Sequence, residues 1–125
     1  MLYLISLGTN EHPHENLALA HRRLSEQFPD IRYSAVYDTP PLFFRHNTAL
    51  FSNQVACFHS MLLPSEVKAR LKAIELEAGR KPLDKQNEVV KLDIDLLACD
   101  LLCYKPDDCQ RDYVRRGIEE LELTI

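Results

Sequence analysis

The chain has 125 residues, of which 15 are Lys or Arg and 19 are Asp or Glu, so its formal net charge is −4 with neutral histidine. This acidic balance argues against a polybasic protein that binds nucleic acid or a membrane surface. With 46% hydrophobic and 27% charged residues, the composition is that of a globular protein. The length predicts a single domain over residues 1–125 with one hydrophobic core.

The chain lacks the sequence signals of a glycine-rich phosphate loop, a membrane span and a secretory leader. With only three glycines, it contains neither GxGxxG nor GxxxxGK[ST], so side chains would have to hold a bound phosphate. No apolar run approaches the ~20 residues of a membrane-spanning helix, and residues 1–7 lack a basic leader and cleavage site. We therefore expect a cytoplasmic protein. We expect its cysteines to be reduced thiols rather than zinc ligands, because they do not form two close pairs: Cys57, Cys99, Cys103 and Cys109.

The first half of the chain alternates between strand and helix patterns. Residues 2–7 form a short apolar run closed by Gly-Thr-Asn, which predicts a buried strand. Residues 13–28 repeat their apolar side chains with a period near 3.6, which predicts an amphipathic helix. Residues 31–37 alternate like a half-buried strand, and the two prolines at 40 and 41 end it. Residues 42–50 show neither period and predict an irregular loop of the kind that carries binding sites.

The second half repeats this order. Residues 51–60 alternate again and predict a third strand, and Pro64 suits the first turn of a helix that Gly79 would terminate. A polar loop over 80–91 precedes a strand at 92–97, and residues 112–123 would form a short helix. The predicted fold is an α+β, ferredoxin-like βαββαβ sandwich. It has a four-stranded antiparallel sheet, two main helices on one face and a short C-terminal helix.

Asp93 and Asp95 are the sharpest candidates for chemistry, because a spacing of two on a strand places both carboxylates on one face. Burying either carboxylate unpaired is costly, so a cation should lie on that face. Mg²⁺ suits the pair, since it takes one or two carboxylates and completes its shell with water and substrate phosphates. The alternative is a solvated edge strand in which Asp93 pairs with Lys91 or a loop arginine.

Two further segments are candidates for binding. The basic residues of the 80–91 loop could hold a polyphosphate beside the aspartates, or could simply be solvated. The segment Thr39-Pro40-Pro41-Leu42 is extended, and its backbone groups are free to bond a planar heterocycle.

Phe51 and Asn53 share a face of the third predicted strand and offer a ring for stacking and an amide for pairing. Core packing and a locally satisfied amide are the structural alternatives for these two residues. The five histidines show no convincing ligand spacing, and we expect them at the surface.

Five short motifs are each weak alone but specific in this order and spacing, over residues 3–100. They are Leu7-Gly8-Thr9-Asn10, Tyr37-Asp38-Thr39-Pro40-Pro41-Leu42, Phe51-Ser52-Asn53, Ile74-Glu75-Leu76-Glu77-Ala78-Gly79-Arg80 and Leu92-Asp93-Ile94-Asp95-Leu96-Leu97. Together they resemble the 6-hydroxymethyl-7,8-dihydropterin pyrophosphokinase family of folate biosynthesis. The resemblance implies transfer of pyrophosphate from ATP to the pterin hydroxymethyl group, giving AMP, with two Mg²⁺ ions bridging the nucleotide phosphates.

The resemblance also implies roles for individual residues. Asp93 and Asp95 are similar to the family's magnesium ligands, and Arg80 is similar to a catalytic arginine that neutralises the transferred phosphates. Lys91 is a second candidate catalytic cation. The implied pterin-binding residues are Thr39, Pro40, Leu42, Phe51, Asn53 and Tyr113, and the implied nucleotide-binding residues are Glu75, Arg80 and Arg111.

The chain also departs from the family pattern. Val90 stands where an arginine is usual, with Lys91 beside it, and Pro82 and Asn87 replace a second loop arginine and a tryptophan. Residues 105–108 lack a Pro-His pair. Two hypotheses follow: a magnesium-dependent pterin pyrophosphokinase, and a non-catalytic ferredoxin-like module that retains a pterin or nucleotide pocket.

Overall fold

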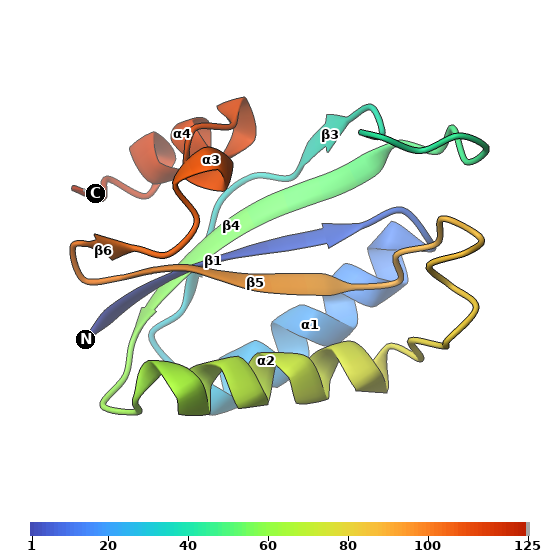
Figure 1. The fold of residues 1–125 in the computed structure, drawn as a ribbon. Helices are drawn as coiled ribbons and strands as arrows, with labels where there is room; N and C mark the ends of the chain where they lie inside the picture. The colour runs from blue at the N-terminus through green and yellow to red at the C-terminus, as the bar shows by residue number, and fades with distance from the viewer. Residues whose placement is uncertain (125) are drawn as a thin grey trace.

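A computed structural model describes residues 1–124 as a sheet with helices on both faces (Figure 1). The strands are β1 (Leu2–Thr9), β2 (Arg32–Tyr33), β3 (Tyr37–Thr39), β4 (Phe51–His59), β5 (Asp93–Cys99) and β6 (Leu102–Cys103). The helices are α1 (Pro13–Gln27), α2 (Pro64–Glu77), α3 (Pro106–Cys109) and α4 (Asp112–Glu120). Every helix in this part of the chain is too short or too polar to cross a membrane.

The strands form one antiparallel sheet in the order β2-β4-β1-β5-β6, with β3 also pairing with β4. The central strand β1 lies between β4 and β5, which is the arrangement expected of a ferredoxin-like order. The expectation of four strands is wrong, because the described residues contain six. The first difference lies in the segment predicted as one strand over 31–37, and the second follows β5.

Ser34 explains why the predicted strand is divided into β2 and β3. The backbone N–H of Ser34 donates to Val55 O at 2.9 Å, and its hydroxyl accepts the N–H of Val55 at 3.0 Å. Tyr33 pairs with Ala56, whereas Tyr37 pairs with Asn53, so one extra residue is accommodated between them. This is a bulge, which an alternating apolar pattern does not reveal.

The sequence analysis also missed the hairpin from β5 to β6 and the short helix α3. Asp100 turns the chain with a left-handed φ of 52°, and its Oδ1 accepts the N–H of Leu2 at 2.7 Å. The turn lacks the glycine that makes such hairpins recognisable in a sequence.

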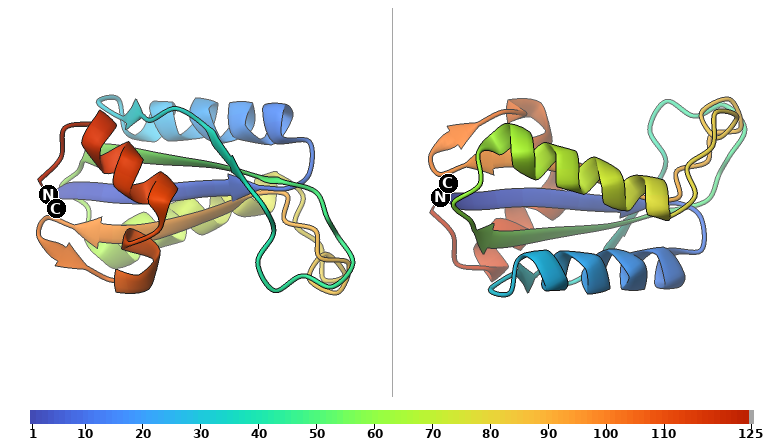
Figure 2. Two further views of the ribbon diagram at one scale, coloured as in Figure 1. Left: turned by 90° about the horizontal axis from the view of Figure 1, so that it is seen from above. Right: turned by 90° about the horizontal axis from the view of Figure 1, so that it is seen from below.

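The two faces of the sheet are covered by different helices. Helices α1 and α2 lie on one face, and α3 and α4 lie on the other (Figure 2). The first face buries a cluster that includes Ile5, Leu24 and Ile74, and the second buries one that includes Val55 and Val114. The expectation of one core is therefore corrected to two clusters separated by the sheet, and burial on both faces explains the continuous apolar run of β1.

Gly117 allows α4 to approach the sheet closely. A Cβ atom at this position would lie 1.9 Å from Cγ2 of Val55, which is closer than any real contact. Helix α4 therefore packs directly on β4.

Candidate functional site

Small and polar residues pair across the sheet near the end of β1. Gly8 on β1 lies between Asn53 on β4 and Asp93 on β5, and Ser6 pairs with Asp95. Because residues two apart on a strand share a face, both carboxylates and the Asn53 amide lie on the face that carries α3 and α4. Gly8 has no side chain and leaves open space between Asn53 and Asp93.

A cavity of about 200 Å³ lies over these residues, and we call it the slot. It is lined by Ser6, Leu7, Gly8, Thr39, Pro40, Leu42, Phe44, Phe51, Asn53, Asp93, Asp95, Asp108, Arg111 and Tyr113. The structure thus brings together both predicted metal ligands and all six residues predicted to bind a pterin. Arg111, predicted to contact nucleotide, also lines it.

Asn53 presents its amide oxygen to the slot. Its side chain is buried, and Nδ2 donates to Thr39 Oγ1 at 2.7 Å and to the carbonyl of Tyr37 at 3.1 Å. Oδ1 accepts no hydrogen bond from within residues 1–124, and it lies on the side of Gly8. The oxygen is therefore the part of this amide that can accept a hydrogen bond from an N–H group of a ligand.

Aromatic rings stand at two sides of the slot. The ring centroids of Phe44 and Phe51 are 5.6 Å apart with an interplanar angle of 45°. On the other side, the guanidinium of Arg111 lies 4.9 Å from the centre of the Tyr113 ring. Phe51 and Tyr113 come from β4 and α4, so the fold places rings from distant parts of the chain around one cavity.

Asp93 and Asp95 have unequal surroundings. Burial, together with the charges of Asp95 and Glu75, raises the pKa of Asp93 to about 7. The Nζ of Lys105 lies 3.2 Å from Asp95 Oδ1. Partial burial lowers the pKa of Lys105, but the Asp95 carboxylate outweighs burial and raises this pKa above its usual value. Lys91 does not pair with Asp93, because its Nζ lies 3.3 Å from Asp84 Oδ2. Within residues 1–124, Asp95 therefore has a cationic partner, whereas Asp93 forms no ion pair.

The carboxylate pair fits a magnesium ion. Asp93 and Asp95 supply hard oxygen donors on one face, and the burial and neighbouring carboxylates that raise the pKa of Asp93 are effects that a bound cation would offset. Within residues 1–124 no group of three or more His, Cys, Asp or Glu side chains could hold a metal by itself. Water and phosphate oxygens of a substrate would therefore have to complete the shell of a bound Mg²⁺.

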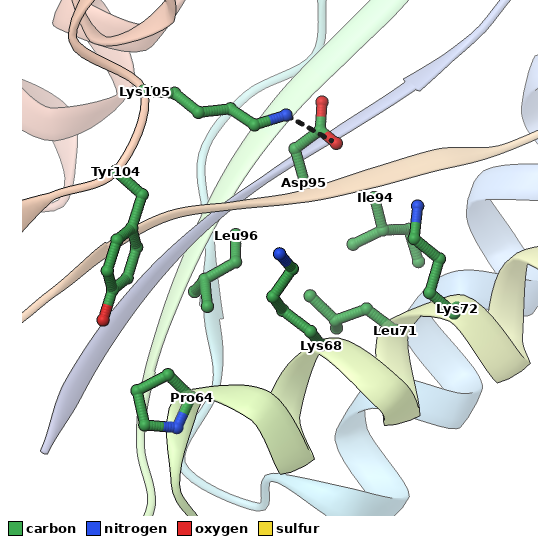
Figure 3. A pocket seen from close by; sticks show the side chains of 9 residues that line it. All are labelled: Pro64, Lys68, Leu71, Lys72, Ile94, Asp95, Leu96, Tyr104 and Lys105. Carbon is green, nitrogen blue, oxygen red and sulfur yellow. Dashed lines mark ion pairs between the residues drawn. The ribbon is translucent and has the colours of Figure 1, made fainter.

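A second cavity, of about 330 Å³, lies between α2, β5 and the segment after β6, and we call it the lysine cavity (Figure 3). It is lined by Pro64, Lys68, Leu71, Lys72, Ile94, Asp95, Leu96, Tyr104 and Lys105. Lys68 and Lys72 extend from α2 toward β5, and Lys105 reaches Asp95 (Figure 3). Asp95 lines both cavities.

Sequence reasoning missed these three lysines. A spacing of four residues places Lys68 and Lys72 on one face of α2, but the same pattern is common on a solvated helix. Only the packing of α2 against β5 turns that face toward Asp95.

Glu75 lines neither cavity, although the resemblance placed it among the nucleotide-binding residues. Its side chain is 1% exposed, Oε2 accepts the N–H of Ile94 at 2.7 Å, and Oε1 lies 3.2 Å from Arg80 Nη1 and 3.4 Å from Lys72 Nζ. Glu75 therefore joins α2 to β5 between the two aspartates.

Within residues 1–124, neither Arg80 nor Lys91 forms an ion pair with Asp93 or Asp95. Both line a third cavity, of about 530 Å³, within the loop that follows α2. The Nζ of Lys91 also donates to the carbonyl of Gly79 at 2.7 Å. Phe44 lines this cavity and the slot, so the two cavities are neighbours, but the structure does not bring the two predicted catalytic cations onto Asp93 and Asp95.

Glu88 joins the 40–50 loop, which lines the slot, to the 80–92 loop, which lines the third cavity, a role that no sequence signal indicated. Its carboxylate accepts the backbone N–H groups of Arg45 and His46, each at 2.6 Å, and that of Asn47 at 2.9 Å. Its carbonyl accepts the Nδ2 groups of Asn10 and Asn47, both at 2.9 Å. We call this arrangement the Glu88 clasp. It holds the 40–50 and 80–92 loops side by side at the end of the sheet away from both termini (Figure 2).

Fold and site together define an α+β protein with an antiparallel sheet and a carboxylate pair, one member of which, Asp95, lines two cavities. A sequence model of the family described as 7,8-dihydro-6-hydroxymethylpterin-pyrophosphokinase (HPPK) matches residues 4–123. The chain belongs to this family, which confirms the resemblance seen in its motifs. Membership associates it with pyrophosphokinase activity in folate biosynthesis, for which the family generally uses ATP and Mg²⁺.

Other comparisons are weaker. No curated protein matches the chain significantly. Among solved structures, the chain is similar to the solution structure of the C-terminal domain of the MgtC protein from Mycobacterium tuberculosis, with 11% identity and a TM-score of 0.44. That similarity covers 76% of this chain and 85% of the other.

Proposed function

We propose that the protein catalyses magnesium-dependent transfer of pyrophosphate from ATP to 6-hydroxymethyl-7,8-dihydropterin, releasing AMP. The observation that carries the proposal is the position of Asp95, which lines both the slot and the lysine cavity. Substrates occupying the two cavities would meet at the carboxylate pair. Such a transfer requires positioning and charge neutralisation rather than a covalent intermediate on the protein.

The slot suits the pterin. Phe51 and Tyr113 offer ring faces to a flat heterocycle, and Asn53 Oδ1 can accept a hydrogen bond from a ring N–H. The backbone around Pro40 supplies further polar groups at the slot's wall. The pterin hydroxymethyl group would then point toward Asp95.

The lysine cavity suits the nucleotide. Lys68, Lys72 and Lys105 offset phosphate charge, and the side chains of Leu71 and Leu96 provide apolar contact for a base. Asp93 and Asp95 would hold the two magnesium ions, which supply neutralisation of the phosphate charge when bound. On nucleotide binding, Lys105 would exchange its partner Asp95 for a phosphate group.

Arg80 and Lys91 are proposed to neutralise the transferred phosphates, and Arg111 to contact the nucleotide from the slot. Because Arg80 and Lys91 line the third cavity, their role requires the 80–92 loop to move toward the carboxylate pair. Glu75 supports the site by fixing β5 to α2 beside Asp93.

The proposal is tested by measuring AMP formation from ATP, Mg²⁺ and the dihydropterin alcohol. We expect AMP and pterin pyrophosphate in equal amounts, with no product when a chelator removes the metal. The second candidate, a non-catalytic binding module, is favoured by Val90 in place of an arginine and by the hydrogen bond that holds Lys91 to Gly79. Saturable binding of pterin without any AMP would support that module and contradict the proposed transfer.

A further inference from the structure

The thiols of Cys103 and Cys109 are in direct contact. Their sulfur atoms are joined by a hydrogen bond at 2.8 Å. Cys109, the last residue of α3, is buried, whereas Cys103 on β6 is partly exposed. Cys57 and Cys99 are buried elsewhere, and neither contacts another sulfur within residues 1–124.

Packing and backbone hydrogen bonds hold the two sulfurs in place. Cys103 pairs with Ala98 of β5, and the N–H of Cys109 donates to the carbonyl of Lys105 at 3.0 Å. Both side chains belong to the apolar cluster under α4. The thiols therefore meet without rearrangement of the chain, and this proximity is what a disulfide requires.

We propose that Cys103 and Cys109 form a redox modification site, which closes to an intramolecular disulfide by exchange with a small-molecule disulfide of the glutathione class. First, the Cys103 thiolate attacks one sulfur of the small disulfide. A mixed disulfide forms on Cys103, the original S–S bond breaks, and the departing thiolate takes up a proton that balances the one lost by Cys103. Next, Cys109 Sγ attacks the Cys103 sulfur, the mixed disulfide breaks, and the Cys109 proton passes to the departing thiolate. The protein loses two electrons and two protons, and the small disulfide becomes two thiols.

The surroundings fix which thiol reacts first. In the reduced protein, burial and the contact with Cys103 raise the pKa of Cys109 to about 12, so Cys109 stays protonated and shielded from reagents in solution until Cys103 has reacted. Cys103 reaches the surface and takes the first step, and Cys109 resolves the adduct from 2.8 Å away.

The disulfide would close a segment that borders both cavities. Tyr104 and Lys105 line the lysine cavity, and Asp108 lines the slot. The bond would restrain this shared wall. The proposal itself does not depend on the proposed enzymatic function, because it concerns only the two thiols.

The test treats the reduced 125-residue chain with oxidised glutathione, then alkylates the remaining thiols in denaturant and measures the intact mass. We expect two alkylated cysteines instead of four and a protein two hydrogens lighter. Cleavage before aspartate residues should give a fragment beginning at Asp100 linked to one containing Cys109. The melting temperature should rise by roughly 5–10 °C and return when a reductant is added.

Three variants complete the experiment. Cys109→Ser should stop at a stable glutathione adduct on Cys103. Cys103→Ser should remain unmodified, and because Cys103 is partly exposed, this variant keeps the test decisive if the substitution of buried Cys109 impairs folding. Cys99→Ala is the matched control and should still lose two thiols. Alkylation of all four thiols in the treated parent protein, or a linked fragment containing Cys57 or Cys99, would overturn the proposal.

Discussion

Asn53 shows how one side chain sets the polarity of the slot. Its amide nitrogen is held by Thr39 and Tyr37, so the oxygen is the atom that a ligand meets. If the side-chain amide flipped, so that its nitrogen and oxygen changed places, both of these hydrogen bonds would be lost. The slot should therefore select a ligand that donates a hydrogen bond to the Asn53 oxygen.

The first prediction compares Asn53→Ala with Phe51→Leu. Loss of the amide leaves a ligand N–H unpaired, at a cost of about 1–3 kcal/mol, or roughly 5-fold to 150-fold in Kd. Loss of stacking costs about 1 kcal/mol. Titration of pterin fluorescence should therefore rank Asn53→Ala as the more damaging change.

Ser52→Ala is the control, because Ser52 bonds to Asp38 and does not line the slot. The reverse ranking would count against this pterin pose.

The second prediction concerns the carboxylate pair. Asp95→Asn keeps the shape of the side chain but removes its charge, so AMP formation should fall by roughly two to three orders of magnitude. The thermal stability should change little, because the partly exposed pair with Lys105 contributes about 1 kcal/mol at most. Asp108→Asn is the matched control within the slot and should retain most activity. A fully active Asp95→Asn protein would exclude Asp95 as a metal ligand.

At the scale of elements, the Glu88 clasp joins two loops by hydrogen bonds. Three successive backbone N–H groups converge on one carboxylate, so its charge is what holds the 40–50 loop to the 80–92 loop. The 40–50 loop carries Phe44, and the 80–92 loop carries Arg80 and Lys91. The clasp therefore links residues of both loops that line the third cavity.

The third prediction is the pH dependence of the clasp. The hydrogen bond from the Asn47 N–H, with those from Arg45 and His46, lowers the pKa of Glu88 below 4.5 although burial opposes this. A lowered carboxyl pKa means that the stabilisation is complete above pH 4.5 and is lost as the pH falls through the pKa of the folded state.

NMR titration of the amides at residues 45–47 should therefore show a transition below pH 4.5, and Glu88→Gln should abolish it. A midpoint at or above the usual value in the parent protein would show that the clasp does not form in solution.

The fourth prediction addresses the missing loop arginine. The backbone of Val90 is fixed by Asn10, whose N–H donates to the Val90 carbonyl at 2.9 Å and whose Oδ1 accepts the Val90 N–H at 2.7 Å. Val90→Arg should preserve both bonds and raise the rate of AMP formation by about 10-fold with little change in pterin affinity, because the new group acts mainly on the transition state.

Val90→Lys should give a smaller gain, since an ammonium cannot form the paired hydrogen bonds of a guanidinium. Lys91→Ala should lower the rate in the same assay. Equal rates for the parent and all three variants would mean that this loop takes no part in the transfer.

The elements that periodicity could predict are those buried along most of their length. Apolar spacing located α1, α2, β1 and β4 closely, because each buries a continuous face. The bulge at Ser34 and the turn at Asp100 depend instead on pairs of hydrogen bonds to one distant residue each, Val55 and Leu2. Such bonds leave no periodic trace, which is why the division of the predicted strand and the added hairpin were not foreseen.

At the scale of the molecule, the sequence located the slot better than the lysine cavity. Strand spacing grouped Asp93 with Asp95, the family resemblance added Asn53, and the structure places all three together because β1 carries β4 and β5 in register on either side. Lys68 and Lys105 join the site only through the docking of α2 and the path of the chain after β6. Contacts between elements, unlike faces within an element, are set by packing that the sequence pattern alone does not specify.

The shared position of Asp95 leads to the last prediction, which separates the two cavities. Lys68→Ala should weaken binding of magnesium-ATP about fivefold, because the lysine is partly solvated, and should leave pterin affinity unchanged. Asn53→Ala should have the converse effect, and Asp95→Ala should weaken magnesium-ATP binding and also remove any coupling between the two ligands. Calorimetry with each ligand alone and then with both measures these effects.

In the double variant, the losses from Lys68→Ala and Asn53→Ala should add in free energy, since the two side chains share no partner. Lys85→Ala removes the same charge outside the lysine cavity and is the matched control. If it weakens magnesium-ATP binding as much as Lys68→Ala, the effect is one of net charge, and the nucleotide does not occupy the lysine cavity.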